Sequence, residues 1–329
     1  MWGTFFYCML FMFYNIYLQQ ALAESKKNCN FAGYLCKIRI NIIHLLNINR
    51  MKKTFLLVAA CVMSMLASAQ ILQVTSVQEL KGASFEDARV AGISPQGDYV
   101  LMTNGSNQGL QRYDIATGEM TVVTKAEGAG FNVQFSQDGK EIVYRERTTG
   151  TDHLRYNTII RTNLIEKKNV VLAEKQTNNN MLVAPGNSNV VLQNSECMMH
   201  IVKNGKRIQI APQGNNVNYI WASLSPNKKK ILYYVSEYGC YVCDIDGRNS
   251  QFIGEDCRAP QWYNNEIIIS MNDQDDGHFT QKSAIMAYTL DGKVQTLTSP
   301  DLIAMYPFAA EGKVVFSTLE GKTYLLNVK

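Results

Sequence analysis

Residue patterns that mark common enzymes are missing from this sequence of 329 residues. It contains no Gly-x-Ser-x-Gly elbow, no glycine-rich phosphate-binding loop and no His-Glu-x-x-His zinc motif. Histidine is scarce as well, with four in the whole chain. These absences argue against the usual serine hydrolases, nucleotide hydrolases and zinc proteases, and they favour binding over catalysis.

Cysteine is too sparse for a disulfide scaffold, because only Cys197, Cys240, Cys243 and Cys257 lie after residue 69. Cys240-x-x-Cys243 has the spacing of a redox or zinc half-site, but no second Cys-x-x-Cys accompanies it. Residues 239–245 have the pattern of a strand, in which a spacing of three points the two thiols to opposite faces. We therefore expect buried or singly paired structural thiols, with the pairing left open.

The apolar run at 54–66 is too short for a stable membrane span. It follows the basic Met51-Lys52-Lys53 and precedes Ala67-Ser68-Ala69, a small-x-small cleavage pattern before Gln70. These three features in this order predict a secretory signal peptide at 51–69. The mature chain is expected to begin at Gln70, without a membrane span, in the periplasm or outside the cell.

Residues 1–50 precede this signal and need an explanation of their own. We interpret them as an upstream extension that results from a wrongly assigned start, with translation beginning at Met51. One alternative takes Trp2–Tyr17 as an apolar segment with a cleavage site at Ala21-Leu22-Ala23, so that the mature chain starts at Glu24. Another concerns Val58-Ala59-Ala60-Cys61, which resembles a lipobox and would make Cys61 a lipid anchor.

An excess of one charge is absent once this leader is set aside. The whole chain has 32 basic and 28 acidic residues, but residues 1–69 hold seven of the basic ones and one of the acidic ones. The remaining 25 basic and 27 acidic residues give a net charge of −2. The composition therefore does not point to a nucleic-acid partner.

A repeat of about forty residues is the most informative feature that the sequence does contain. Its first element recurs in three clear copies: Ile93-Ser-Pro-Gln-Gly-Asp-Tyr-Val-Leu101, Phe135-Ser-Gln-Asp-Gly-Lys-Glu-Ile-Val143 and Leu224-Ser-Pro-Asn-Lys-Lys-Lys-Ile-Leu232. Degenerate copies begin at Ala184, Trp262 and Phe308. Equivalent positions fall at 94, 136, 184, 225, 263 and 309, which makes six repeats.

Each repeat predicts four short antiparallel strands. Ser-Pro-x-Gly and Asp-Gly segments supply the fixed and the positive φ of tight turns, and β-branched and aromatic runs such as Lys230–Val235 lie between them. Four such strands cannot bury their own faces, whereas sheets stacked radially bury them against one another. The sequence therefore predicts an all-β, six-bladed β-propeller of four-stranded antiparallel blades over residues 70–329. The sixth repeat ends at its third strand, so a strand at Ile71–Val77 is expected to close the ring.

The turn motifs resemble those of a known family. They are Ser94-Pro-Gln-Gly, Ser136-Gln-Asp-Gly, Ser225-Pro-Asn, Pro260-Gln-Trp262 and the Asp-Gly pairs at 246–247 and 291–292. They are similar to the Ser-Pro-Asp-Gly and Asp-Leu-Asp-Gly motifs of TolB-like propellers, also called WD40-like repeats. The resemblance spans residues 86–329 and implies a fold rather than a function. TolB carries an α/β domain before its propeller, and none is expected here, so the resemblance does not extend to the role of TolB in the Tol–Pal system.

Two groups of residues are candidate sites. Trp221 and Trp262 occupy first-strand positions, which line the axis of a propeller, and could form a platform for a carbohydrate or peptide; the alternative is packing between blades. The segment Asn272–His278 gathers Asp273, Asp275, Asp276 and His278 as candidate metal ligands. A solvated hairpin is the preferred interpretation, since Ser283 stands where a calcium loop of the EF-hand type places its closing Glu. No cofactor is expected.

We expect a non-catalytic binding or scaffold protein of the bacterial cell envelope, either a monomer or a subunit of a complex. It would present one face of the propeller to an envelope protein, a peptide or a glycan. The alternative is a polysaccharide-processing lyase or hydrolase, because some TolB-like propellers resemble pectin-fragment lyases that hold a divalent metal with histidines at the channel mouth. His153, His200 and His278 lie at different repeat offsets, which argues against a shared site. A broad apolar exposed face would favour the binding protein.

Overall fold

The computed structural model describes residues 70–82, 85, 87–177, 190–195, 197–203 and 206–329. The predicted leader at 1–69, with Cys61 and the alternative cleavage site at 21–23, lies outside the described residues. Apart from one short 3₁₀ helix, η1 (Pro300–Leu302), the described elements are β-strands. None of the described segments is a helix with the length and hydrophobicity needed to cross a bilayer.

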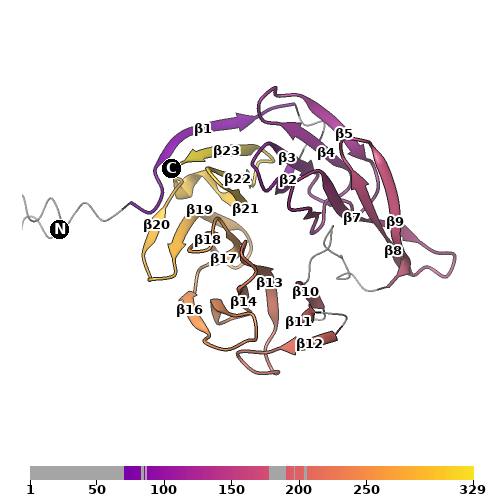
Figure 1. The fold of residues 1–329 in the computed structure, drawn as a ribbon. Helices are drawn as coiled ribbons and strands as arrows, with labels where there is room; N and C mark the ends of the chain where they lie inside the picture. Colours follow the sequence, from indigo (N-terminus) through magenta and orange to yellow (C-terminus); the bar gives the residue numbers. More distant parts are fainter. Residues whose placement is uncertain (1–69, 83–84, 86, 178–189, 196, 204–205) are drawn as a thin grey trace, which may run out of the picture. The chain divides into compact units, whose positions relative to one another are not determined.

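The strands form six antiparallel sheets, which we number 1 to 6 in chain order, and five of these sheets have four strands (Figure 1). Sheet 1 contains β2 (Arg89–Ile93), β3 (Tyr99–Thr103), β4 (Leu110–Asp114) and β5 (Met120–Thr124); sheet 2 contains β6 (Gln134–Phe135), β7 (Glu141–Thr149), β8 (Arg155–Asn163) and β9 (Lys168–Gln176). Sheet 4 contains β13 (Tyr219–Leu224), β14 (Lys230–Val235), β15 (Gly239–Asp244) and β16 (Gln251–Gly254); sheet 5 contains β17 (Arg258–Trp262), β18 (Ile267–Asp275), β19 (Thr280–Thr289) and β20 (Val294–Thr296). Sheet 6 contains β21 (Ala304–Ala310), β22 (Lys313–Thr318), β23 (Thr323–Val328) and β1 (Val74–Leu80).

Sheet 3 has three described strands, β10 (Val190–Ser195), β11 (Met198–Lys203) and β12 (Lys206–Ile210). The stretch before Ala184, where the repeat places its first strand, belongs to residues 178–189, which lie outside the described residues. Five four-stranded sheets are therefore shown where the repeat predicts six. Strand β1 pairs with β23 from Val74 opposite Val328 to Leu80 opposite Thr323, so the N-terminal strand supplies the outer strand of the last sheet.

Buried serines explain why the first turn of the repeat is so regular. The Oγ atoms of Ser94, Ser136 and Ser225 accept hydrogen bonds from the backbone N–H five residues later, at 3.2, 2.9 and 3.0 Å. All three side chains are buried. A serine thus satisfies an N–H donor that the tight turn would otherwise leave unpaired, which is the general requirement for buried backbone groups.

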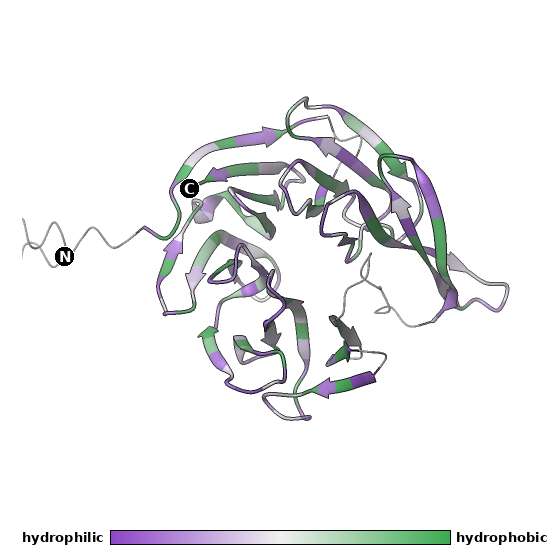
Figure 2. Ribbon diagram, viewed as in Figure 1, coloured by the Kyte–Doolittle hydropathy of each residue, from purple (hydrophilic) through white to green (hydrophobic). Residues whose placement is uncertain are grey.

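Hydrophobic clusters lie between neighbouring sheets. Tyr99 and Leu101 of sheet 1 pack with Ile142 and Tyr144 of sheet 2, and all four are buried. Burial of one such side chain stabilises the fold by roughly 1.5–3 kcal/mol. The hydrophobic residues lie mainly on the strands (Figure 2), as expected for sheets that bury both faces against one another.

The two cysteines of the Cys-x-x-Cys segment confirm the prediction of opposite faces. Cys243 belongs to the cluster between sheets 3 and 4, together with Met199 and Ile231. Cys240 belongs to the cluster between sheets 4 and 5, together with Trp262 and Ile268. Both thiols are buried, so this segment packs as a strand between two neighbouring sheets.

Candidate functional site: the central cavity

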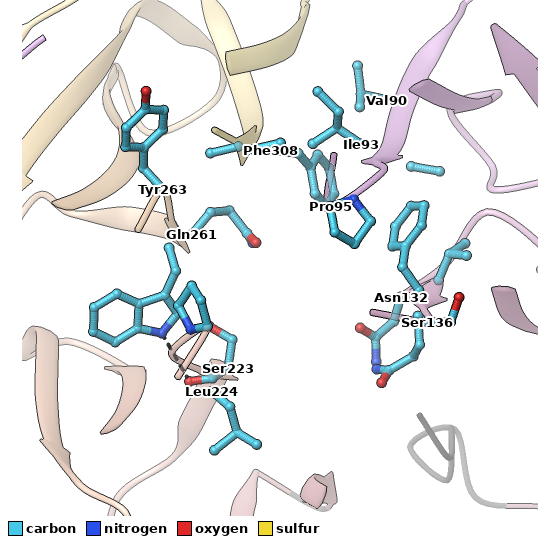
Figure 3. Close-up of a pocket in the computed structure, with 18 of the residues that line it drawn as sticks. Val90, Ile93, Pro95, Asn132, Ser136, Ser223, Leu224, Gln261, Tyr263 and Phe308 are labelled. Atoms are coloured by element: carbon cyan, nitrogen blue, oxygen red, sulfur yellow. Dashed lines mark hydrogen bonds between the residues drawn. The ribbon is translucent and has the colours of Figure 1, made fainter. Parts of the chain in front are cut away.

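The first strands β2, β13, β17 and β21 face a common centre in Figure 1, and a cavity of about 2060 Å³ lies there. Its lining comes mainly from these strands, from β6 and from the turns that follow them, with further residues from the hairpin between β3 and β4 and from β8, β10 and β22. Figure 3 shows Val90, Ser223, Gln261 and Phe308, each from a different sheet, and Asn132, which precedes β6, around this space. Five of the sheets therefore contribute to one wall by their first strands.

Carboxamides and aromatic rings dominate the polar and the apolar parts of this wall. The carboxamides are Gln96, Asn104, Asn107, Asn132, Gln134, Gln137, Asn163, Gln261, Asn264 and Asn265, and the rings are Phe131, Phe135, Trp221, Trp262, Tyr263, Tyr306 and Phe308. The described charged lining residues balance, with Arg89, Lys140 and Lys228 against Asp138, Glu141 and Glu311. Such a wall suits a polar ligand without a strong net charge, because carboxamides both donate and accept hydrogen bonds.

A left-handed backbone conformation recurs in the first strands, or just before them, near the cavity wall. Asn132, Trp221, Ala259 and Tyr306 have φ values of 53°, 51°, 46° and 50°, in the left-handed region. The last three lie in bulges that interrupt the pairing of β13, β17 and β21 with their neighbours. Left-handed conformations cost non-glycine residues free energy and occur often at binding sites, and bulges re-aim side chains. No glycine stands at these positions, so the sequence does not mark them as left-handed.

The two predicted tryptophans both line the cavity but differ in environment. Trp221 is half-buried, and its ring meets Tyr234 edge-on with centroids 5.3 Å apart. Trp262 is 8% exposed, packs in the cluster between sheets 4 and 5, and donates a hydrogen bond from Nε1 to the Ser223 carbonyl at 3.4 Å. Trp262 therefore matches the packing alternative, and Trp221 has more surface to offer a ligand.

The predicted acidic group separates into two parts. The Asp273 carboxylate is 5% exposed and forms an ion pair with Arg258, with Nη1 2.7 Å from Oδ2. Asp275, Asp276 and His278 lie on the exposed hairpin between β18 and β19, where the backbone N–H groups of Phe279 and His278 hold the pKa of Asp276 below its ordinary value. Across the described part of the chain, no three His, Cys, Asp or Glu side chains come together as metal ligands.

The histidines do not converge on the cavity. His153 lies in the hairpin between β7 and β8, His200 lies in β11, and His278 lies in the hairpin between β18 and β19. No histidine occurs among the described residues that line the central space. The geometry therefore gives no support to a histidine-held metal at the channel mouth.

Comparisons with known proteins identify the fold of the chain and nothing more specific. No family model matches the chain, and no curated protein does. Among solved structures, a putative TolB from Agrobacterium tumefaciens aligns over 74% of this chain and 90% of its own, with a TM-score of 0.51 and 12% identity. An oligogalacturonate lyase from Vibrio parahaemolyticus (71% and 76% covered, TM-score 0.45, 12% identity) and TolB from Acinetobacter baumannii (72% and 53%, 0.45, 13%) also align. The chain spans about half the length of the latter TolB.

The chain has a TolB-like β-propeller fold. At one end of this propeller, which we call the turn end, lie the turns between first and second strands. Adjacent blades are joined there: Gln96 Nε2 donates to the Gln137 carbonyl at 2.8 Å, and the Asn227 N–H donates to Asn265 Oδ1 at 3.0 Å. The turn end is therefore polar, and many of its hydrogen-bonding groups are used within the molecule.

The opposite end, which we call the hairpin end, carries the hairpins between second and third strands and the starts of the first strands. Exposed apolar side chains occupy the tips of four hairpins: Leu154 (56% exposed), Tyr238 (60%), Phe279 (73%) and Leu319 (49%). Phe131 and Tyr306, which line the cavity near the starts of first strands, are also exposed, at 39% and 47%, and we call this exposed part of the lining the cavity mouth. The hairpins of sheets 2 and 5 are the longest, with strands of nine or ten residues.

Proposed function

We propose that this chain is an exported, non-catalytic binding propeller of the bacterial envelope, which engages a protein, peptide or glycan through its hairpin end. The observation that carries the proposal is the set of exposed apolar side chains at the hairpin end, on four hairpin tips and at Phe131 and Tyr306 of the cavity lining. Large exposed apolar side chains gathered at one end of a protein mark interaction surfaces, and aromatic residues contribute much of the binding energy at such surfaces.

A protein or peptide partner fits this end best. The four apolar tips stand on separate hairpins, so a partner must be broad enough to reach several of them. An extended segment of the same partner could enter the cavity, where carboxamides such as Asn132 and Gln261 would pair with its backbone N–H and C=O groups. The balanced charge of the wall favours backbone contacts over recognition of a strongly charged segment.

The proposal includes a six-bladed ring that begins after a cleaved signal peptide at 51–69. Six repeats in the sequence and the pairing of β1 with β23 support the ring. The order of basic, apolar and small residues before Gln70 supports export to the periplasm or the medium. A lyase is the weaker alternative, because the described cavity wall lacks histidine.

Affinity purification of a C-terminally tagged chain begun at Met51, from envelope fractions, tests this proposal. We expect a mature mass that starts at Gln70 and a stoichiometric partner. The double variant Tyr238→Ser/Phe279→Ser should lose the partner, while Val122→Ser/Val294→Ser, which removes equally exposed side chains from outer strands, should keep it. A bound divalent metal without any partner, or loss of the partner in both variants, would count against the proposal.

A further inference from the structure

Two buried cysteines from neighbouring blades lie together at the boundary between sheets 4 and 5. Cys240 is the second residue of β15, and Cys257 directly precedes β17. Both side chains are completely buried, in one cluster with Leu232, Val242 and Ile268. The sequence spacing gives no hint of this pair, because the nearer partner along the chain, Cys243, faces the other side of sheet 4.

The two side chains approach each other beside Gly254. Cys240 pairs with Gly254 across β15 and β16, and the Cβ atom of Cys257 lies 3.6 Å from the position that a Cβ atom on Gly254 would occupy. Residues paired across two strands carry their side chains on the same face of the sheet, so Cys240 and Cys257 enter the same buried space and can be joined without displacement of their backbones. We propose that Cys240 and Cys257 form a disulfide bond that joins sheet 4 to the start of sheet 5.

The chemistry of this step is an oxidation by thiol–disulfide exchange. The S–H bonds of Cys240 and Cys257 are lost and one S–S bond forms, which releases two protons and two electrons. A disulfide donor, such as glutathione disulfide or a protein disulfide, accepts both and becomes two thiols. Inside the cell such a donor needs an oxidising compartment, so the in vivo part of the inference rests on the proposed export.

Burial determines when the bond can form. Burial and the neighbouring Cys257 side chain raise the pKa of the Cys240 thiol well above its ordinary value. Thiolates, not thiols, carry out exchange, so the folded and reduced pair reacts slowly. We therefore expect the bond to form during folding, before the cluster closes, and to resist external reductants afterwards.

The proposed bond lies next to the start of β17, a strand that lines the cavity. The segment that leads from Cys257 into β17 contains Arg258, which is paired with Asp273, and the left-handed Ala259 of the recurring bulge. A covalent link from Cys240 would fix the start of this segment to sheet 4. The hairpin end would then keep its shape where blades 4 and 5 meet.

Peptide mapping tests the bond on the full chain. The protein is unfolded with reductant, refolded in a buffer of reduced and oxidised glutathione, alkylated after unfolding without reductant, and digested with trypsin. Peptide 231–248, which holds Cys240 and Cys243, should be linked to peptide 249–258, which holds Cys257. Recovery of both peptides unlinked and alkylated from the wild-type protein would overturn the assignment.

Variants at the two strand cysteines identify the linked thiol. Cys243→Ser should retain the link, and Cys240→Ser should lose it; a link that persists in Cys240→Ser would show that Cys243 is the partner and overturn the proposal. Where a variant fails to fold, fragmentation of the linked wild-type peptide still decides, because it shows which of Cys240 and Cys243 carries the alkyl group. In urea, closing this loop should lower the unfolding equilibrium constant on the order of 100-fold relative to the reduced protein.

Expression of the chain from Met51, followed by analysis of its location, its N-terminus and its link, tests the disulfide and export separately. An exported chain that starts at Gln70 but lacks the link would overturn the disulfide and leave export supported. A chain retained in the cytoplasm, together with the link in refolded protein, would overturn export and leave the disulfide supported.

Discussion

The turn end and the hairpin end are built from the same repeats, yet they differ in chemistry. At the turn end, Ser136 and Ser225 occupy equivalent places and make equivalent bonds to their own turns. At the hairpin end, the tips carry unrelated apolar residues on hairpins of different length. A tight turn accepts only a few residue types, whereas the solvent-exposed tip of a hairpin accepts many. The contrast separates the part of each repeat that builds the fold from the part available for binding.

Among substitutions at the two ends, the largest effect on stability is expected from removal of a turn-end serine. Ser225→Ala deprives the Lys230 N–H of its acceptor and should lower the free energy of unfolding by about 1–2 kcal/mol. Urea unfolding followed by circular dichroism measures the change. Ser106→Ala is the control, because Ser106 is exposed in the hairpin between β3 and β4. Equal effects of the two substitutions would contradict the contrast between the ends.

A smaller effect, of opposite sign, is expected at the cavity mouth. Tyr306 holds a φ of 50° and is 47% exposed, so it has little packing to lose. Tyr306→Asn should raise the free energy of unfolding by roughly 0.5 kcal/mol, because Asn tolerates the left-handed region better. Asn132, which precedes β6, is an asparagine that already holds such a conformation, with a φ of 53°.

The same variant should weaken binding of the partner, since it removes an exposed ring from the mouth. A higher urea midpoint of unfolding together with a loss of the recovered partner would indicate that the strained tyrosine serves binding. A destabilised variant would show that the ring is held for packing, and Asn132→Ala, which should destabilise, is the matching control.

A pH-dependent effect distinguishes two turns of otherwise similar geometry. Asp138 accepts hydrogen bonds from the Ser136 hydroxyl and the Lys140 N–H, which lower the pKa of its carboxyl from the ordinary 3.8. In the Ser225 turn the same bonds go to the neutral Asn227. A depressed carboxyl pKa contributes stability that is complete above the unfolded value and is lost as pH falls through the folded value.

Asp138→Asn should therefore remove a dependence that sets in below pH 3.8. Unfolding in urea over a pH series should show the wild type losing more stability than the variant on acidification. The reciprocal Asn227→Asp should add such a dependence. No change of slope in either variant would show that these carboxyl bonds do not contribute to folding.

How far the sequence predicts the structure depends on the range of the interactions involved. Lys230–Val235 was predicted as a strand and is β14, because a β-branched and aromatic run bounded by turn residues is a local signal. The left-handed Trp221 and Tyr306 were not predicted, since no glycine or asparagine marks them and the bulge depends on pairing with a second strand. The proximity of Cys240 and Cys257 was not predicted from the sequence for a related reason: it depends on how two neighbouring sheets pack against each other.

The smallest effect on stability, and the clearest for function, is expected at the hairpin tips. Leu154→Ser, Tyr238→Ser, Phe279→Ser and Leu319→Ser each alter an exposed side chain and should change the free energy of unfolding by less than about 0.5 kcal/mol. The four together should lower the binding of a fluorescent dye that reports exposed apolar surface, measured on the free protein. An unchanged dye signal, or a loss of stability comparable to that of Ser225→Ala, would mean that the tips pack within the molecule and that the two ends do not differ in role.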